Sequence, residues 1–180
     1  MMRNEGELIR RYLRNGEVAA VHELLSAYED GLYRYLWQML RHQQDSEDAL
    51  QETFRKALKA LPNYREENYF KSWLFRIGHN TALDLIRRRK KVVEMGENEE
   101  ETIGAEGAGP GEVLEASERI AELRSAVARL PESEREVVTL RLQEDLSFRE
   151  IAEVVGAPLG TVLSRMRNAK QRLKIQLATL

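Results

Sequence analysis

Apolar residues recur every three or four positions along four stretches of the N-terminal half, a spacing typical of amphipathic helices. The strongest stretch runs from Glu17 to Arg41, and a weaker one covers Glu5–Arg14. Two more helices are predicted over Ser46–Ala60, with Asp45 as the N-cap, and over Asn68–Lys91. We expect these helices to pack as a bundle around one core. The predicted core positions are Val18, Val21, Leu24, Leu25, Tyr28, Leu32, Tyr35, Leu36, Met39, Leu50, Phe54, Leu58, Trp73, Leu74, Ile77, Ala82, Leu85 and Ile86.

The C-terminal third predicts a short helix and a longer helix joined by a tight turn. Ser147 precedes the segment "FREIAEVV", which stops at Gly156, and a second helix begins near Leu159. Ala152, Gly156 and Val162 have helix-turn-helix spacing, because the helices need a small residue where they touch and a glycine where the turn takes a positive φ. The expected core residues of this unit are Ile151, Val155, Val162, Met166 and Leu173.

The second helix of this pair carries a basic face. Arg165, Arg167, Lys170 and Arg172 lie in a stretch that contains no acid. A recognition helix places its N-terminal residues against base edges in the major groove, while nearby cations reach phosphates. The outward positions are predicted to be Leu163, Ser164, Arg167, Asn168 and Gln171. The spacing alone also allows a helical hairpin with a solvated basic face.

Composition favours an all-α protein with two domains. The 180 residues are 42% hydrophobic and 32% charged, with only four prolines. Between Glu94 and Glu115 the chain has eight glutamates and five glycines without Lys or Arg, which is too polar to offset the entropy of ordering. We therefore predict an N-terminal helical bundle over residues 1–91, a flexible acidic linker over 92–115, and a C-terminal helix-turn-helix domain over 116–180.

The sequence offers little for catalysis or metal binding. It contains no cysteine, which excludes disulfides and thiolate metal sites, and its histidines His22, His42 and His79 are scattered. We expect no catalytic residue, no metal and no cofactor. Because no apolar run suits a signal peptide or a membrane span, we expect a cytoplasmic protein without membrane insertion. With a net charge of −2, the basic helix is a local feature of one module.

Two blocks of sequence resemble one known family. The segment "LPESEREVVTLRLQEDLSFREIAEVVGAPLGTVLSRMRNAKQRL" resembles region 4 of the extracytoplasmic-function, or group 4, sigma factors of bacterial RNA polymerase. The segments "DSEDALQETFRKAL" and "YFKSWLFRIGHNTALDLIRRRKK" resemble their region 2. The resemblance implies a non-catalytic subunit that binds core polymerase, recognises the −35 and −10 promoter elements and helps to melt the −10 region. The implied partners are the clamp of the largest polymerase subunit, the flap of the second-largest subunit, promoter DNA and a cognate anti-sigma factor.

The resemblance also assigns roles to individual residues. The outward face formed by Asp48, Gln51, Glu52 and Arg55 would dock on the polymerase clamp, although spacing alone favours a solvated face. The residues implied to bind the −10 element are Asn63, Tyr64, Tyr69, Phe70, Asn80, Arg87, Arg88 and Arg89. Those implied for the −35 element are Arg141, Thr161, Ser164, Arg165, Arg167, Asn168 and Arg172.

Some positions depart from the family pattern or leave alternatives open. Leu163 stands where a basic residue is common, and "NAK" at Asn168–Lys170 replaces an Arg-Ala-Arg run, so the −35 consensus does not transfer. In larger sigma factors an acidic connecting segment threads the active-site cleft and the RNA exit channel. The linker is therefore either a solvated spacer or a nucleic-acid mimic.

Two other functional classes compete with this interpretation. An ordinary DNA-binding regulator would need a ligand pocket, a phosphoryl site or a dimer face in its first half, where the docking pattern lies instead. A sigma-like adaptor or anti-sigma antagonist would be expected to lack the basic run Arg87–Lys91, which is present.

Overall fold

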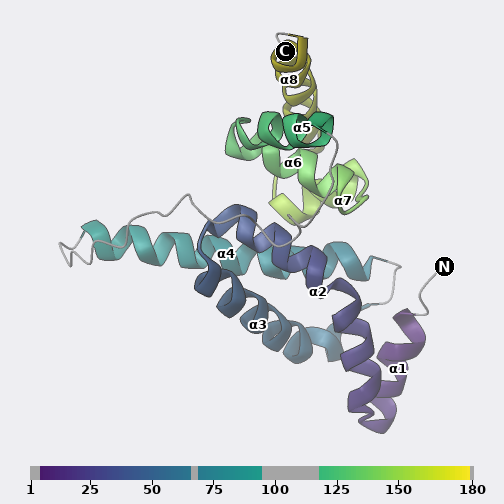
Figure 1. Cartoon of the computed structure of the whole chain (residues 1–180). Coiled ribbons are helices and arrows are strands. Elements are labelled where there is room, and N and C mark those ends of the chain that lie inside the picture. Colours follow the sequence, from purple (N-terminus) through teal and green to yellow (C-terminus); the bar gives the residue numbers. More distant parts are fainter. Residues whose placement is uncertain (1–4, 66–68, 95–117, 179–180) are drawn as a thin grey trace. The chain divides into compact units, whose positions relative to one another are not determined.

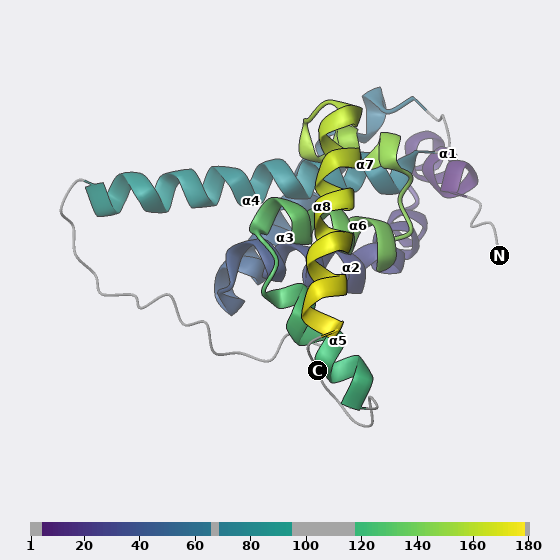
Figure 2. The same cartoon turned by 90° about the horizontal axis from the view of Figure 1, so that it is seen from above.

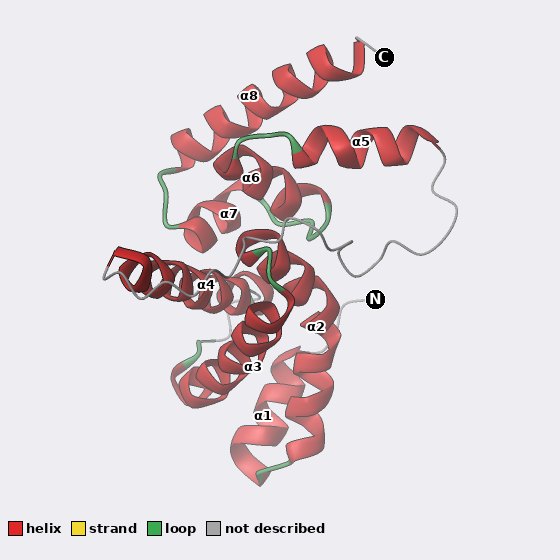
Figure 3. Ribbon diagram, turned by 60° about the vertical axis from the view of Figure 1, so that its left-hand side comes forward, coloured by secondary structure: helices red, strands yellow, loops and turns green. Residues whose placement is uncertain are grey.

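The structure is a computed structural model that describes residues 5–65, 69–94 and 118–178. Its helices fall into two units, α1 to α4 within residues 1–109 and α5 to α8 within residues 110–180. Every regular element of the described residues is a helix, which confirms the all-α prediction (Figures 1 and 3).

The N-terminal unit contains the helices that the apolar pattern predicts. Helix α2 packs against α1, α3 and α4, and α3 also packs against α4. The observed helix ends differ from the predicted ends by a few residues, and α4 continues three residues beyond Lys91. The bounds are α1 Glu5–Asn15, α2 Val18–Leu40, α3 Gln43–Ala60, the short 3-10 helix η1 Leu61–Asn63, and α4 Phe70–Glu94.

The core of this unit lies where α2, α3 and α4 meet. Leu32, Leu36 and Phe75 are fully buried, and the buried Tyr35 hydroxyl hydrogen-bonds to His79 Nδ1 at 2.8 Å. Val18 was predicted as core but is 71% exposed, because it begins α2 and lies outside the crossing of the three helices. The predicted core residues that are only half-buried are Tyr28, Met39, Phe54, Leu58, Trp73, Ile77, Leu85 and Ile86.

Helix α3 begins earlier than predicted and has a different N-cap. His42 takes extended backbone angles, and its Nδ1 accepts a hydrogen bond from the Asp45 backbone N–H at 3.3 Å. A ring nitrogen thus satisfies the first-turn N–H of Asp45, and the N-cap is His42 and not Asp45. Asp45 lies inside the first turn, where a carboxylate also interacts favourably with the helix dipole.

The C-terminal unit packs three helices against one long helix. Helix α8, Leu159–Ala178, contacts α5, Glu118–Ala128, as well as α6, Glu132–Leu142, and α7, Phe148–Val155. The fully buried residues at its centre are Val137, Leu140, Ile151, Val154 and Val162.

Two core predictions for this unit need correction. Val154 is buried and Val155 only half-buried, because position i+3 from the buried Ile151 shares its helix face, whereas position i+4 turns partly outward in this short helix. Leu173 is half-buried, since it lies near the end of α8. The predicted domain and linker boundaries stay predictions, and residues 95–115 of the linker lie outside the described residues.

Candidate nucleic-acid interface and the acidic face beside it

The geometry of α7 and α8 confirms the predicted helix-turn-helix. Ser147 and Glu150 form a reciprocal capping box, in which Glu150 N–H donates to Ser147 Oγ and Ser147 N–H donates to Glu150 Oε2. Gly156 ends α7 with a φ of +63°, the left-handed conformation that glycine adopts without strain. After the turn, the Pro158 carbonyl accepts the backbone N–H of Thr161 at 2.9 Å, which starts the first turn of α8.

The outer face of α8 carries polar and basic side chains together with the exposed Leu163 and Ile175. All of the residues predicted to point outward are exposed, including Leu163 at 42%. Arg165 and Thr161 are half-buried, and the Thr161 carbonyl accepts a hydrogen bond from Ser164 Oγ at 2.8 Å. The exposed residues of this face are Leu163, Ser164, Arg167, Asn168, Lys170, Gln171, Lys174 and Ile175.

An aromatic cluster lies at the start of α4. The Tyr64 ring is 4.9 Å from the Trp73 ring and meets the Phe70 ring edge-on at 5.6 Å, with centroids as the reference points. Phe70 also lies 5.8 Å from Tyr28 of α2. Phe70 is 1% exposed, whereas the neighbouring Tyr69 is 52% exposed. One side of the cluster, at Phe70, is therefore buried, whereas its other side, at Tyr64 and Tyr69, is partly exposed to solvent.

The C-terminal part of α4 carries the basic run and projects past the ends of α2 and α3 (Figures 1 and 2). Arg87 and Arg88 are exposed, and an Asp84 oxygen lies 3.5 Å from Arg87. Arg89 is half-buried and forms an ion pair with Asp45 of α3. Arg87 and Arg89 thus form intrachain ion pairs, and Arg88 interacts electrostatically with Glu52.

The outward face of α3 carries both acids and cations. Asp48, Gln51 and Arg55 are exposed, and Arg55 donates two hydrogen bonds to the Glu52 carboxylate, at 2.6 and 2.7 Å. These bonds hold the pKa of Glu52 below its ordinary value and raise the pKa of Arg55. The lowered pKa keeps Glu52 charged throughout the physiological pH range.

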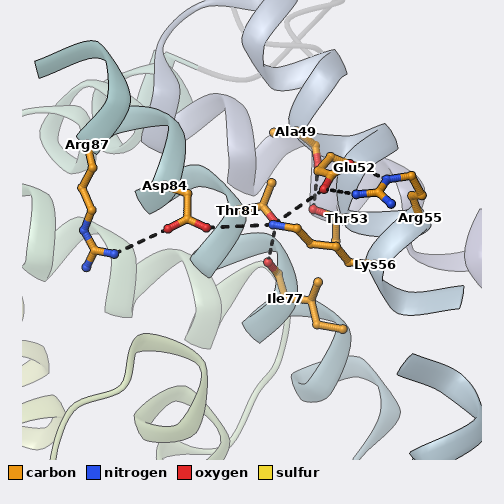
Figure 4. A network of polar contacts seen from close by, with 9 residues as sticks. All are labelled: Ala49, Glu52, Thr53, Arg55, Lys56, Ile77, Thr81, Asp84 and Arg87. Atoms are coloured by element: carbon orange, nitrogen blue, oxygen red, sulfur yellow. Dashed lines mark hydrogen bonds and ion pairs between the residues drawn. The ribbon is translucent and has the colours of Figure 1, made fainter. Parts of the chain in front are cut away.

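A polar network joins α3 to α4 beside this face (Figure 4). Lys56 Nζ lies 3.9 Å from Glu52, 4.0 Å from Asp84 and 3.1 Å from Thr81 Oγ1. Thr81 is buried and donates its hydroxyl hydrogen to the Ile77 carbonyl. The network joins this outward face of α3 to α4, the helix that carries the basic run.

Comparison with known protein families matches both units. Residues 24–92 match sigma-70 region 2, and residues 120–173 match sigma-70 region 4. The RNA polymerase sigma-H factor of Pseudomonas aeruginosa is 31% identical over 175 residues, which cover 93% of this chain and 90% of that protein. The ECF RNA polymerase sigma factor SigE of Mycolicibacterium smegmatis is 35% identical over 157 residues, or 87% of this chain.

The chain belongs to the extracytoplasmic-function (ECF) sigma factors of the sigma-70 family. It spans 61% of the length of the M. smegmatis relative. A solved structure also has the same fold: the sigma factor RpoE in complex with the anti-sigma factor NepR from Bartonella quintana. It aligns with a TM-score of 0.66 and 23% identity, covering 93% of this chain and 98% of that one.

The residues of this sigma factor that were predicted to bind the −10 element differ in their exposure to solvent. Asn63, Tyr69 and Asn80 are exposed, and Tyr64 is half-buried. Phe70, predicted to bind the −10 element, is 1% exposed and packs against Tyr64 and Trp73, so its role toward DNA stays a prediction. Trp73, predicted as core, is half-buried within the same cluster.

Two cations predicted for region 4 have intrachain partners. Arg141 Nη1 donates to Asp145 at 3.2 Å and to the Leu146 carbonyl at 3.1 Å, and its guanidinium lies over the Phe148 ring. Arg172 forms an ion pair with the buried Glu134. Whether any region 4 residue touches DNA stays a prediction.

Sequence reasoning missed the sigma-factor residues that join α3 to α4. Lys56, Thr81 and Asp84 carried no role in the prediction. The i, i+4 spacing of Glu52 and Lys56 could have indicated an intrahelical pair. The link to Asp84 depends on how two helices cross, which no local pattern encodes.

Among residues 5–65, 69–94 and 118–178, no three His, Cys, Asp or Glu side chains form a group that could hold a metal ion. None of the described helices is both long enough and apolar enough to cross a membrane.

Proposed function

We propose that this ECF sigma factor binds core RNA polymerase and directs it to promoters that carry a −10 and a −35 element. Region 2 would recognise the −10 element and help to melt it, and region 4 would recognise the −35 element. The observation that carries the proposal is the presence in one chain of two DNA-suited units: an aromatic cluster beside a basic helix, and a helix-turn-helix with an exposed polar face.

The −10 proposal is supported by the shape of the aromatic cluster. Extruding a base costs a few kcal/mol of stacking, which ring contacts must offset. Tyr69, at 52% exposure, and the half-buried Tyr64 would receive that base, with Asn63 beside them. The buried Phe70 supports the cluster from beneath. Asn80, exposed farther along α4, would read the neighbouring base.

The basic run would hold the duplex next to the melted segment. Arg87 and Arg88 are exposed, and Arg89 is half-buried, on the part of α4 that projects beyond its neighbours. A cationic row that leads to aromatic rings follows a phosphate backbone into a strand-separated segment. These arginines would therefore contact phosphates without reading sequence.

The −35 proposal is supported by the outer face of α8. Ser164, Arg167 and Asn168 are exposed near its N-terminal half, the part that faces base edges when a recognition helix enters the major groove. Thr161 and Arg165 lie at the margins of this face and are half-buried. Their reach is suited to phosphates at the edge of the groove.

Polymerase docking is assigned to α3 of region 2. Asp48, Gln51, Glu52 and Arg55 form a mixed polar face whose carboxylates can pair with a basic coiled coil on the clamp. Region 4 would contact the flap of the second-largest subunit. A cognate anti-sigma factor is a further proposed partner, since the similar B. quintana sigma factor was solved with one. All of these partners place the protein in the cytoplasm.

Reconstitution with core polymerase tests the proposal. Core enzyme supplemented with the full chain should produce transcripts with defined 5′ ends from a genomic DNA library, whereas core enzyme alone should not. An ordinary DNA-binding regulator would block transcription or leave it unchanged. If the chain binds DNA but yields no defined start sites with core enzyme, the sigma-factor function is contradicted.

A further inference from the structure

Glu134 is a buried carboxylate in the unit that carries the recognition helix. It lies in the first turn of α6, and its side chain is 8% exposed. Burying a carboxylate is costly unless a cation and hydrogen-bond donors compensate it. The cations of α6 itself are paired elsewhere: Arg135 donates to the carbonyls of Ala128 and Leu130, and Arg141 pairs with Asp145. The compensating charge comes from another helix.

That charge is Arg172 of α8. Its Nε donates to Glu134 Oε1 at 3.3 Å and lies 3.1 Å from Oε2, although 38 residues separate the two in sequence. The contact joins the first turn of α6 to the C-terminal half of α8. Arg172 is itself 55% exposed, so the pair lies at the edge of the α6–α8 interface and not at its centre.

The cations of α8 divide between two flanks of the helix. With roughly 100° between successive residues, Arg165 and Arg172 fall on one side of the buried stripe that contains Val162 and Met166. Arg167 and Lys170 fall on the other side. The flank that carries Arg172 faces α6, as its contact with Glu134 establishes. Moving Arg172 to a phosphate would leave the Glu134 carboxylate buried without its cation.

We propose that Arg172 and Glu134 form a positioning pair that fixes the angle of the recognition helix on α6. Arg172 then acts through Glu134 and not through DNA, in place of the −35 contact that the sequence predicted. The inference deepens the proposed −35 recognition and rests on it. Because base readout needs side chains placed to within a fraction of an ångström, a small rotation of α8 is expected to reduce discrimination among −35 sequences.

A set of four variants tests the pair in the full chain. Calorimetry reports the melting temperature of the C-terminal unit, since both tryptophans lie in α2 and α4 and fluorescence would miss it. Binding of the holoenzyme to a library-selected −35 duplex, and to its scrambled form, gives the discrimination ratio and the salt dependence. The variants are Arg172→Ala, Arg172→Lys, Glu134→Ala with Arg172→Ala, and Arg167→Ala.

Arg172→Ala should lower the melting temperature by roughly 5–15 °C and reduce discrimination severalfold well below that temperature, with the salt slope unchanged. Arg172→Lys should restore most of both quantities, because an ammonium can still pair with the carboxylate. The double alanine variant should be more stable than Arg172→Ala, since the buried charge is gone. Arg167→Ala should reduce discrimination among −35 sequences at an unchanged melting temperature, as expected of a residue that faces base edges.

Other outcomes overturn the inference. If Arg172→Ala lowers the salt slope by about one and leaves the melting temperature alone, Arg172 is a phosphate contact. If it lowers only the melting temperature, the pair stabilises the unit without positioning the helix, and if it changes nothing the pair has no role. If the holoenzyme binds the scrambled duplex as tightly as the selected one and Arg167→Ala does not change binding, the −35 assignment itself fails. The melting temperatures of the variants then still show whether Glu134 and Arg172 are coupled in stability.

Discussion

Gly78 of α4 lies at the crossing of α2, α3 and α4 and provides a sharp test of how region 2 packs. A Cβ added there would lie 2.8 Å from Leu32 Cδ1, and 3.7 Å from side-chain atoms of both Leu36 and Thr53. Gly78→Ala therefore places two opposing effects at one position. Removing a glycine from a helix interior stabilises by about 1 kcal/mol, whereas overpacking a filled core costs about 1–3 kcal/mol.

The burial of Leu32 decides which effect prevails. Its side chain is 0% exposed, so the methyl group that meets the new Cβ cannot swing into solvent. The neighbouring Leu36 and Thr53 are also fully buried, which leaves little room for a new rotamer. We expect Gly78→Ala to lower the free energy of unfolding by about 1 kcal/mol net, even though alanine is the better helix former.

Urea denaturation followed by tryptophan fluorescence measures this effect in the correct unit, because Trp37 and Trp73 lie on α2 and α4. In a Leu32→Val background the Cδ1 methyl group that would meet the new Cβ is absent. Gly78→Ala should then raise the free energy of unfolding by up to about 1 kcal/mol. Gly160→Ala serves as a control by calorimetry, since nothing lies within 4 Å of its added Cβ. A Gly78→Ala variant more stable than the native protein would refute the packing argument.

Three further predictions concern function. Gln51→Ala with Glu52→Lys should weaken core-polymerase binding by at least about tenfold in a native gel with helicity unchanged, because both side chains lie on the surface of α3; unchanged binding would remove that face from the interface. Tyr69→Ala should reduce strand opening on a promoter with little loss of stability, whereas Phe70→Ala should lower the free energy of unfolding by about 3–5 kcal/mol. Equal stabilities of the two variants would contradict the burial of Phe70 within the aromatic cluster. If the linker mimics nucleic acid, replacing the five glutamates between residues 97 and 106 by glutamine should weaken holoenzyme formation and alter the ratio of abortive to full-length RNA. If the variant behaves like the wild type at low salt, where exposed charges are least screened, the linker is only a tether.

The helices of this protein could be predicted from sequence because their signals are local. Apolar spacing located all four helices of the first unit, and the pair of Ser147 and Gly156 bounded α7 correctly. Errors arose where two local solutions compete. A histidine ring nitrogen caps α3 in place of the expected carboxylate at Asp45, and Val154 replaces Val155 in the core because position i+3 from Ile151 faces the centre more directly than position i+4.

The candidate site was less predictable because its contacts join distant parts of the chain. Residue type singled out Phe70 and Arg172, but Phe70 is buried in the aromatic cluster, and Arg172 pairs with a carboxylate 38 residues away. The hydrogen bond from Lys56 to Thr81 spans 25 residues and depends on the crossing of α3 and α4. Exposure of Asp48 and Gln51 followed correctly from helical periodicity alone.

Mapping of transcript 5′ ends after overexpression of the chain tests the central claim most directly. The account predicts new start sites, each preceded by two short sequence blocks at a constant separation, which are the −10 and −35 elements. The new sites should disappear with the Gln51→Ala, Glu52→Lys chain when it is expressed to the same level. Altered transcript abundance without new start sites, or a single upstream block at variable distance, would contradict promoter recognition by two regions of one sigma factor.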